Sequence, residues 1–413
     1  MTQKSKEGRN VPNLRFPGFG YEWTQTTLEA CSESLEYGMN SAAMTFDGKN
    51  KYIRITDIDE ASSKYNPDVP VSPEGDLEDK YLVKENDILF ARTGASTGKS
   101  YLYNINDGKL YFAGFLIKVK VNHLNNANFI FNQTKTDHYQ RWVTVMSMRS
   151  GQPGINSKEY ASFKFWVPSK SEQDKIASFF TIIDKRIEAQ SKIIEDYKLL
   201  KKGLMQKIFK QKIRFKDKDG QELHEWEIKK LSNLCERVSR KNKEDNKNVL
   251  TISAQLGLIN QEEYFNTSVS AKNVTGYYLL EKNEFAYNKS YSKGYPMGAV
   301  KRLKKYEKGV VSTLYICFEF NAEVSLEFME QYFESGFHNH ELSKVAQEGA
   351  RNHGLLNIAV GDFFATKLLL PSKQEQQKIA STLSAIDDKI ELETKLLEQF
   401  KTQKQYFLQN LFI

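Results

Sequence analysis

The sequence predicts an α+β protein with two similar α/β domains and two long helices that pack as an antiparallel coiled coil. Three observations predict this fold. A segment of about forty residues occurs twice, 203 residues apart, and an apolar heptad pattern runs through both copies. A similar short sequence also precedes the stretch of chain that leads to each copy. Self-similarity at a fixed period indicates a repeated structural unit. Here the period is about half of the 413 residues, so a pseudo-twofold internal repeat is expected.

The repeat divides the chain into five segments. They are an N-terminal segment (1–20), a first body (21–167), a central long helix (168–209), a second body (210–370) and a C-terminal long helix (371–413). A phrase with Arg, Phe and Trp leads into each body: Arg15 and Phe16 answer Arg214 and Phe215, and Trp23 answers Trp226 203 residues later.

Both bodies read as short strands followed by a helix and a Gly-containing loop. In the first body KYIRITDI, DILFAR, FLIKVKV and FKFWV alternate apolar and polar residues, as strands do, while NFIFNQTKTDHYQRWV reads as one helix before the loop SMRSGQPGIN. The second body gives NVLTISAQLG, EFAYN, GAVKRL and VVSTLYICFEF as strands, then the helix LEFMEQYFESGF and the loop GARNHGLLN. The order of elements matches although the residues differ, so the two domains could recognise different targets.

The duplicated segment has the marks of a long helix. Pro168 and Pro371 end an apolar strand, the next residue is a Ser that can serve as N-cap, and a Glu three residues later completes a capping-box pattern. Apolar residues then recur at spacings of four and three, which is typical of a coiled-coil seam. Polar residues interrupt the seam in pairs, at Gln190 and Glu393 and at Lys201 and Lys404. An apolar stripe on a globular helix is the alternative, but forty residues is long for such a helix.

Composition limits the class of protein. The net charge is +7, from 59 Lys and Arg against 52 Asp and Glu, which permits nucleic-acid binding without requiring it. Mean hydropathy is −0.58, no apolar run is long enough to span a bilayer, and the first ten residues lack the apolar core of a signal peptide. The expected location is the cytoplasm. Cys31, Cys235 and Cys317 are widely spaced, so we expect buried single thiols and neither a disulfide framework nor a zinc site.

Two short motifs resemble parts of known active sites, but each lacks a feature that such a site requires. RTGASTGKS has three residues between its glycines, where a phosphate-binding P-loop needs four. His338, Asn339 and His340 spell HNH without an accompanying metal-ligand pattern, so a solvated loop after a helix is expected there. We therefore expect no catalytic centre, no metal site and no bound cofactor in this chain.

The loops instead carry residues suited to DNA. Arg, Asn and Gln can present two hydrogen bonds to a base edge, and Lys, Ser, Thr and Tyr can bind phosphates. The candidates in the first body are Arg54, Thr56, Arg92, Thr93, Ser96, Thr97, Lys99, Arg149, Ser150 and Gln152. Those in the second body are Gln255, Asn288, Lys289, Ser290, Tyr291, Lys293, Tyr295, Arg351, Asn352 and His353.

The complete pattern resembles the specificity subunits of Type I restriction-modification enzymes. The most specific parts are VPSKSEQDKIASFFTIIDKRIE and LPSKQEQQKIASTLSAIDDKIE, supported by YIRITDI, NDILFARTGASTGK and GQPGIN. The resemblance implies two target recognition domains that each read one half of a split double-stranded DNA site. It also implies that the two long helices set the spacing of the half-sites and dock partner subunits. The residues that match the helix motif are Glu172, Gln173, Ile176, Ile183 and Asp184, and Glu375, Gln376, Ile379, Ile386 and Asp387.

The same resemblance implies the partners. They would be two methyltransferase subunits with S-adenosylmethionine and restriction subunits that use ATP and Mg²⁺, and this chain would have no activity alone. Three alternatives stay open at this point: a coiled-coil scaffold with two protein-binding domains and no DNA role, an enzyme with an unrecognised active site, and a partner of a methyltransferase that has no nuclease.

Overall fold

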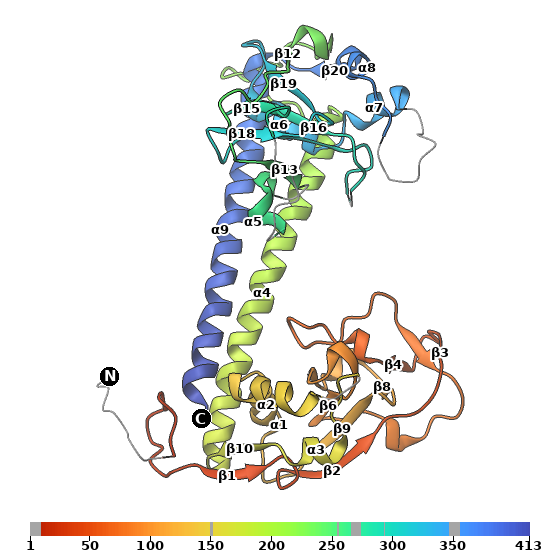
Figure 1. Cartoon of the computed structure of the whole chain (residues 1–413), viewed down its shortest axis with the longest axis vertical. Coiled ribbons are helices and arrows are strands. Elements are labelled where there is room, and N and C mark those ends of the chain that lie inside the picture. Colours follow the sequence, from red (N-terminus) through yellow and green to blue (C-terminus); the bar gives the residue numbers. More distant parts are fainter. Residues whose placement is uncertain (1–9, 149–151, 254–255, 266–273, 293, 347–355) are drawn as a thin grey trace. The chain divides into compact units, whose positions relative to one another are not determined.

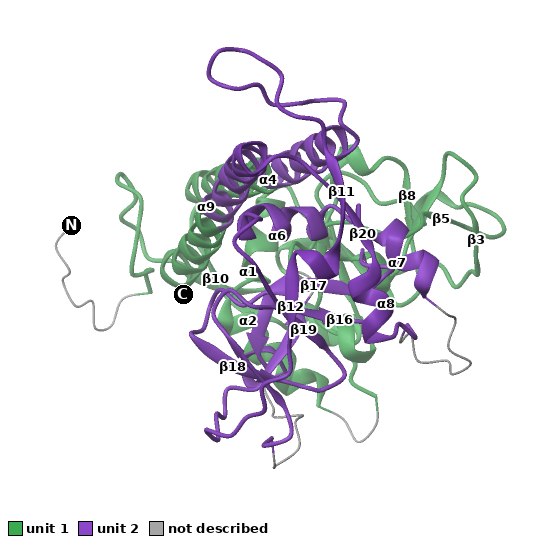
Figure 2. Ribbon diagram, turned by 90° about the horizontal axis from the view of Figure 1, so that it is seen from above, with its two compact units in different colours: residues 1–191, 395–413 green, residues 192–394 purple. Residues whose placement is uncertain are grey.

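The structure is a computed structural model that describes residues 10–148, 152–253, 256–265, 274–292, 294–346 and 356–413 (Figure 1). It forms two compact units (Figure 2). Unit 1 comprises residues 1–191 and 395–413, and unit 2 comprises residues 192–394. Each unit therefore contains one body together with the start of one long helix and the end of the other.

The centre of unit 1 is an antiparallel four-stranded sheet. Its order is β2 (Ser32–Tyr37), β9 (Leu116–Val121), β6 (Asp87–Ala91) and β7 (Ser100–Leu102). β6 reads DILFA and is buried along its whole length. The smaller pairs are β1 (Thr24–Thr27) with β10 (Lys164–Val167), β3 (Ala43–Thr45) with β5 (Val71–Pro73), and β4 (Lys51–Ile53) with β8 (Leu110–Phe112); the short helices are α1 (Ala127–Gln133), α2 (Asp137–Ser147) and α3 (Ser157–Ala161).

Unit 2 repeats this plan. Its four-stranded sheet has the order β12 (Cys235–Val238), β19 (Ile316–Phe320), β16 (Phe285–Asn288) and β17 (Ala299–Arg302), again antiparallel throughout. The smaller pairs are β11 (Glu227–Lys230) with β20 (Lys367–Leu370), β13 (Leu250–Ser253) with β14 (Gly257–Asn260), and β15 (Tyr278–Glu281) with β18 (Lys308–Val311); the helices are α5 (Gln261–Phe265), α6 (Leu326–Glu334), α7 (Asn339–Val345) and α8 (Val360–Ala365). The internal repeat predicted from the sequence is confirmed.

The two long helices are α4 (Lys170–Phe209) and α9 (Lys373–Leu411). In unit 1 the core joins Phe180, near the start of α4, to Leu408 and Phe412, at the end of α9. In unit 2 the core joins Phe209, at the end of α4, to Leu383 near the start of α9. In both units the start of one helix packs beside the end of the other, so the predicted antiparallel pairing is confirmed.

Three local expectations are corrected. The helix expected over 128–143 is two helices, because the chain turns at Thr134–Thr136, and Thr136 caps α2 by accepting a hydrogen bond from the Tyr139 amide. VVSTLYICFEF is two strands, β18 and β19, separated by a turn. KYIRITDI is a strand only over β4, and a 3₁₀ turn, Ile55–Asp57, follows.

The HNH triplet is also different from the expected solvated loop. His338 is 2% exposed, and its Nε2 lies 2.9 Å from the Thr366 Oγ1. The ring packs edge-on against Phe333 and Phe363 in the core of unit 2. His338 is therefore a core residue whose polar edge is bonded to a neighbouring side chain.

Within the part of the chain that the structure describes, no helix combines the length and apolarity that crossing a bilayer requires. Over the same residues, no group of three or more His, Cys, Asp or Glu side chains is arranged to hold a metal ion. The three cysteines are free and buried.

Candidate nucleic-acid interface

Two loops of unit 1 that sequence analysis selected separately lie against each other. The first, 92–98, follows β6, and the second, 152–155, precedes α3. The Gly94 amide donates to the Pro153 carbonyl at 2.9 Å, and the Ile155 amide donates to the Arg92 carbonyl at 2.9 Å. We call these the paired loops of unit 1. They bring together the predicted residues Arg92, Thr93, Ser96, Thr97 and Gln152.

The hydroxyls of two buried tyrosines fix the first of the paired loops of unit 1 to the core. Tyr160 donates to the Ala91 carbonyl at 2.7 Å, and Tyr139 donates to the Gly98 carbonyl at 2.9 Å. Gly98 has φ +91°, and a Cβ there would lie 2.6 Å from a methyl of Val143. Only glycine fits this position without strain. Both ends of the loop are thus fixed to the core. Within the loop the Thr97 hydroxyl donates to the Gly94 carbonyl at 2.8 Å, and Arg92, Thr93 and Ser96 are half-buried.

Arg92 is the cation at the centre of this surface. Its Nη1 donates to the Gly114 carbonyl at 3.2 Å, and its guanidinium lies 4.9 Å from the ring centre of Tyr37. Tyr37 is 43% exposed and Phe115, which follows Gly114, is 61% exposed. Neither aromatic residue is among the contacts predicted from the sequence. An aromatic residue in a turn between strands, close to a Gly, is the signal that could have found Phe115.

The other predicted residues of unit 1 are less available. Arg54 is bonded through Nε and Nη2 to the buried carboxylate of Asp57, at 2.9 and 2.8 Å. Lys99 pairs with Glu60 at 3.1 Å, and Thr56 is exposed in the 3₁₀ turn after β4. Arg54 therefore holds its own turn together, and Lys99 ties the paired loops to the segment around Glu60.

Unit 2 contains the same arrangement with different residues. β16 is followed by the loop 289–298, and the Leu356 amide donates to the Lys289 carbonyl at 3.0 Å, as Ile155 does to Arg92. The Lys289 ammonium lies 3.4 Å from the Ile358 carbonyl. Asn288 Oδ1 accepts from the Ser290 amide, and Tyr291 is 63% exposed. These are the paired loops of unit 2, 289–298 with 356–358.

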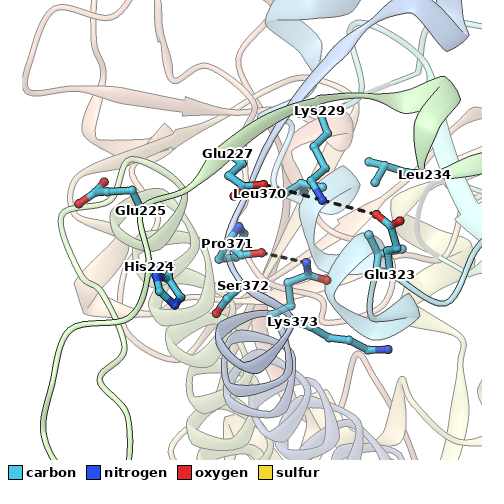
Figure 3. A pocket seen from close by; sticks show the side chains of 12 residues that line it. His224, Glu225, Glu227, Lys229, Leu234, Glu323, Leu370, Pro371, Ser372 and Lys373 are labelled. Carbon is cyan, nitrogen blue, oxygen red and sulfur yellow. Dashed lines mark hydrogen bonds and ion pairs between the residues drawn. The ribbon is translucent and has the colours of Figure 1, made fainter.

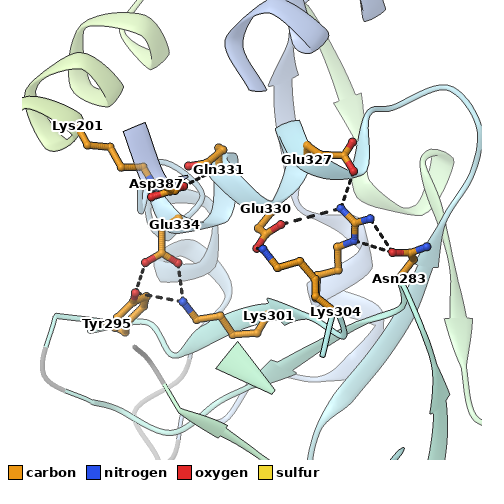
Figure 4. A network of polar contacts seen from close by, with 11 residues as sticks. Lys201, Asn283, Tyr295, Lys301, Lys304, Glu327, Glu330, Gln331, Glu334 and Asp387 are labelled. Atoms are coloured by element: carbon orange, nitrogen blue, oxygen red, sulfur yellow. Dashed lines mark hydrogen bonds and ion pairs between the residues drawn. The ribbon is translucent and has the colours of Figure 1, made fainter. Parts of the chain in front are cut away.

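A charged network connects the loop of unit 2 to α6 (Figure 4). The Tyr295 hydroxyl donates to Glu334, and Lys301 on β17 pairs with the same carboxylate at 2.5 Å. Burial and the neighbouring Glu334 carboxylate raise the pKa of Tyr295 well above its usual value. Arg302 pairs with Glu327 at 2.8 Å on the same helix. Tyr295 therefore orients the loop through α6, while Tyr291 is directed to solvent.

Seven predicted contact residues lie outside the described residues. They are Arg149, Ser150, Gln255, Lys293, Arg351, Asn352 and His353.

The Glu of each helix motif binds the Arg of the phrase that precedes each body. In unit 1 Arg15 donates to both oxygens of Glu172, each at 2.7 Å. In unit 2 Arg214 donates to both oxygens of Glu375, at 3.0 and 3.1 Å. Glu172 and Glu375 are buried. The Glu half of the expected capping box is replaced by a bidentate ion pair, because each carboxylate binds the guanidinium. In unit 2 the Ser half is present, since Ser372 Oγ accepts from the Glu375 amide at 3.4 Å.

The Gln of each motif joins its helix to the body. Gln173 accepts from the Asn126 amide at 3.0 Å and donates to the Pro168 carbonyl at 3.1 Å. Gln376 accepts from the Ser325 amide at 2.9 Å and donates to the Pro371 carbonyl at 3.0 Å. Asn126 and Ser325 are the N-caps of α1 and α6. The motif therefore fixes a body helix onto the beginning of a long helix.

The Asp of each motif pairs with a seam lysine of the other helix. Asp184 lies 2.6 Å from Lys404 within unit 1, and Asp387 lies 2.6 Å from Lys201 within unit 2. Ile176 and Ile379 are buried, whereas Ile183 and Ile386 are half-buried. The predicted docking residues thus serve the packing of their own unit, and their role in partner docking stays a prediction for the helix surface around them.

A small cavity of about 160 Å³ lies in unit 2 at the start of α9 (Figure 3). Its wall includes Lys229, which faces Glu323 at 3.5 Å and Glu227 at 3.8 Å. Gln376 also lines it but is bonded to Pro371 and Ser325. Since Lys229 and Gln376 are already bonded to neighbouring protein groups, we assign no ligand to this cavity.

Comparisons with known proteins agree on one relationship. The model of a family described as "Type I restriction modification DNA specificity domain" matches residues 38–196 and again 224–402. A curated relative, the Type I restriction enzyme MjaVIII specificity subunit of Methanocaldococcus jannaschii, is 25% identical over 349 residues, which cover 78% of this chain and 77% of the relative.

Two solved structures have a similar fold. The S subunit of a Type I restriction-modification system from M. genitalium has a TM-score of 0.57 at 16% identity, with 98% of this chain and 99% of that chain covered. A chain from a structure of Type I restriction-modification complex assembly has a TM-score of 0.52 at 14% identity, with 96% and 98% covered.

Proposed function

The chain belongs to the family of Type I restriction modification DNA specificity domains, of which it carries two, and we propose that it is a specificity subunit that reads a bipartite DNA site with one unit per half-site. The observation that carries this proposal is the recurrence of the paired loops. In each unit a cation, Arg92 or Lys289, follows a buried central strand and is bonded through its carbonyl to a second loop. Equivalent frames with different side chains suit two half-sites of different sequence.

The chain would direct the chemistry of partner subunits. We propose that it docks two methyltransferase subunits, which supply S-adenosylmethionine and methylate adenine at N6, and restriction subunits that use ATP and Mg²⁺. A target adenine inside a duplex must be flipped out to be methylated, so the role left to this chain is to position the duplex. Such a complex would act in the cytoplasm, where the chromosome of a prokaryotic cell lies.

A genome-wide map of N6-methyladenine tests the proposal. Cells that express the chain with its methyltransferase are compared with cells that lack only this chain. We expect a split, asymmetric motif to be methylated only when the chain is present. Identical maps would contradict the proposal and would favour a scaffold without a DNA role.

A matched pair of variants tests the paired loops. Lys289→Gln and Lys282→Gln make the same change at opposite ends of β16, since Lys282 lies in the turn before the strand and pairs with Glu307. We expect Lys289→Gln to weaken binding to the mapped site and to reduce the slope of log affinity against log salt by about one, as loss of one phosphate contact does. Lys282→Gln should leave both unchanged.

A further inference from the structure

A large apolar side chain is exposed in the turn before a central strand of each unit, and in unit 1 this turn contacts the paired loops. Phe115 is 61% exposed and Leu314 is 62% exposed. Each lies in the turn that leads into a central strand of its sheet, β9 for Phe115 and β19 for Leu314. Single exposed apolar residues are common on protein surfaces and need no explanation.

The strands β6 and β16 can be aligned by the turns that precede them. The buried carboxylate of Asp87 accepts from the Lys84 amide at 2.8 Å, and that of Glu284 accepts from the Glu281 amide at 2.8 Å. The residue before each carboxylate is an Asn with positive φ, 69° in unit 1 and 77° in unit 2. Asn86 and Asn283 each stand at the same place in the turn of their own unit. Because positive φ is uncommon for residues other than glycine, this match identifies the two positions as equivalent.

The register of the sheets then places the two apolar residues. In unit 1 Phe90, three residues after Asp87, pairs with Ile117. In unit 2 Tyr287, three residues after Glu284, pairs with Ile316. Phe115 stands two residues before Ile117, and Leu314 stands two residues before Ile316. They are therefore structurally equivalent, although the turns that hold them, FAGFL and VVSTLYI, differ in sequence.

The surroundings of this position are those of a DNA contact. In unit 1 the Arg92 amide donates to the Phe115 carbonyl at 3.0 Å, so Phe115 lies next to the central cation of the paired loops. In unit 2 the equivalent cation is Lys289, which follows β16 as Arg92 follows β6. A cation that binds phosphate beside an apolar side chain is the combination used by proteins that insert Phe or Leu between base steps.

We propose that Phe115 and Leu314 are apolar wedges, each inserted between adjacent bases of the half-site that its unit contacts. This inference rests on the proposed DNA-binding function. The wedge separates one base step, and the neighbouring cation holds the phosphate beside it. Each unit thus reads base edges with its paired loops and also deforms the DNA at one base step. The free energy of that deformation depends on how easily the step unstacks, so it adds to sequence specificity.

Binding of the full chain, in complex with its methyltransferase, to a duplex with the mapped site provides the first test. We expect Phe115→Ala to weaken binding about tenfold, the scale of one lost base–aromatic stack, and Leu314→Ala to weaken binding by a smaller factor, because an aliphatic side chain fills the step without stacking. The slope of affinity against salt should not change, because no phosphate contact is lost. Phe115→Leu should retain most of the affinity, and Phe115→Lys should weaken binding despite its added charge.

Two exposed isoleucines serve as controls. Ile105 is 78% exposed in unit 1 and lies beyond the opposite end of β6, where the Tyr103 amide bonds to the Asp87 carbonyl. Ile228 is 69% exposed on β11 of unit 2. Ile105→Ala and Ile228→Ala should bind as the unaltered chain does. Thermal unfolding of all variants should coincide, since none of these side chains is buried.

The second measurement detects the wedge directly. 2-Aminopurine, whose fluorescence rises when it is unstacked, is placed at each position of the mapped site in turn. We expect a rise at one step in each half-site, lost with Phe115→Ala in one half and with Leu314→Ala in the other. Unchanged affinity or unchanged fluorescence in these variants, while the unaltered complex binds the site, would overturn the wedge alone.

Loss of the methyltransferase from the complex without a change in DNA contact would overturn the wedge in favour of a protein-binding role for these side chains. Absence of sequence-specific binding by the unaltered complex would instead overturn the proposed function.

Discussion

At the scale of single residues, the ion pair between the motif Glu and the preceding Arg joins the parts of each unit. The two copies are not identical. Glu375 also accepts from the indole N–H of Trp226 at 3.2 Å, whereas the buried indole nitrogen of Trp23 has no partner among the described residues. Glu375 also accepts from the Phe215 amide at 3.4 Å, so the same motif satisfies two more polar groups in unit 2 than in unit 1.

Removal of these carboxylates should destabilise both units, and unit 2 more. Glu172→Ala leaves Arg15 without its partner and should cost about 3 kcal/mol, the usual scale for breaking a buried pair. Glu375→Ala should cost about 1 kcal/mol more, because the Trp226 N–H also loses its acceptor. Hydrogen exchange read by mass spectrometry follows the two units separately. In a Trp226→Phe background most of the difference should disappear, leaving only the share of the long Phe215 contact, and an undiminished difference would contradict this explanation.

His338 should make unit 2 sensitive to acid. Burial lowers the pKa of His338 from 6.5 to about 4. Between these values the unfolded chain binds a proton that the folded unit does not, so stability falls as the pH decreases. We expect unit 2 to lose about 2 kcal/mol between pH 7.5 and pH 5 from this residue.

Hydrogen exchange of unit 2 peptides across a urea series measures this effect, whereas tryptophan fluorescence would mix Trp226 with the tryptophans at positions 23, 142 and 166 of unit 1. His338→Gln is the control, since glutamine does not titrate. The variant should be less stable at pH 7.5 but should lose about 2 kcal/mol less than the unaltered chain on acidification. Equal losses in both chains would show that His338 titrates normally.

At the scale of elements, the two lysines in the helix seam each pair with an Asp of the other helix. The Lys404 side chain is 25% exposed and its partner Asp184 39% exposed; the equivalent Lys201 and Asp387 are 13% and 43% exposed. Pairs of this exposure contribute about 1 kcal/mol or less. Their effect is to specify alignment more than to add stability, because a slipped helix would bury an unpaired lysine.

An exchange of charges tests this pairing. Asp184→Lys alone places two cations together and should lower the melting temperature of the helices, measured by circular dichroism at 222 nm. The double variant Asp184→Lys with Lys404→Asp should recover most of the loss, because the pair is restored with opposite polarity. Failure of the second change to recover stability would contradict a direct pairing of the two side chains.

At the scale of the whole molecule, the continuity of α4 and α9 from one unit into the other is the central feature. α4 has 40 residues and α9 has 39. At 1.5 Å per residue, each helix is about 60 Å long, which is enough to span more than one turn of a duplex, about 34 Å. Our hypothesis is that helix length sets the spacer between the half-sites.

Removal of one heptad from both helices tests the hypothesis. Seven residues are deleted between Asp184 and Lys201 and seven between Asp387 and Lys404. The helices shorten by about 10 Å, so the spacer of the methylated motif should shorten by about three base pairs. Deletion from one helix only is the control, which should disrupt pairing and abolish methylation. An unchanged spacer after the double deletion would refute the hypothesis.

Much of the architecture was predictable because it is written in local periodicity. The duplicated segment, its heptads and the strands DILFA and FAYN depend on residues close in sequence, and the structure confirms them. Breaks between elements were less predictable. The Thr136 hydroxyl ends the expected helix by accepting a hydrogen bond from the Tyr139 amide, and such a bond leaves no mark in the pattern of apolar residues. His338 was misjudged for a similar reason, since its burial depends on Phe333 and Phe363 packing around it.

That the chain is a tandem repeat with two long paired helices and two unlike loop sets follows from the order of its residues, because repetition and periodicity are local properties. What those residues contact follows from the folded structure alone. It joined Arg92 to Ile155, Glu172 to Arg15 and Asp184 to Lys404, and it placed Phe115 and Leu314 at one equivalent position. Such contacts link residues far apart in sequence, and they depend on strand register and helix alignment, which are set by the packing of the whole unit.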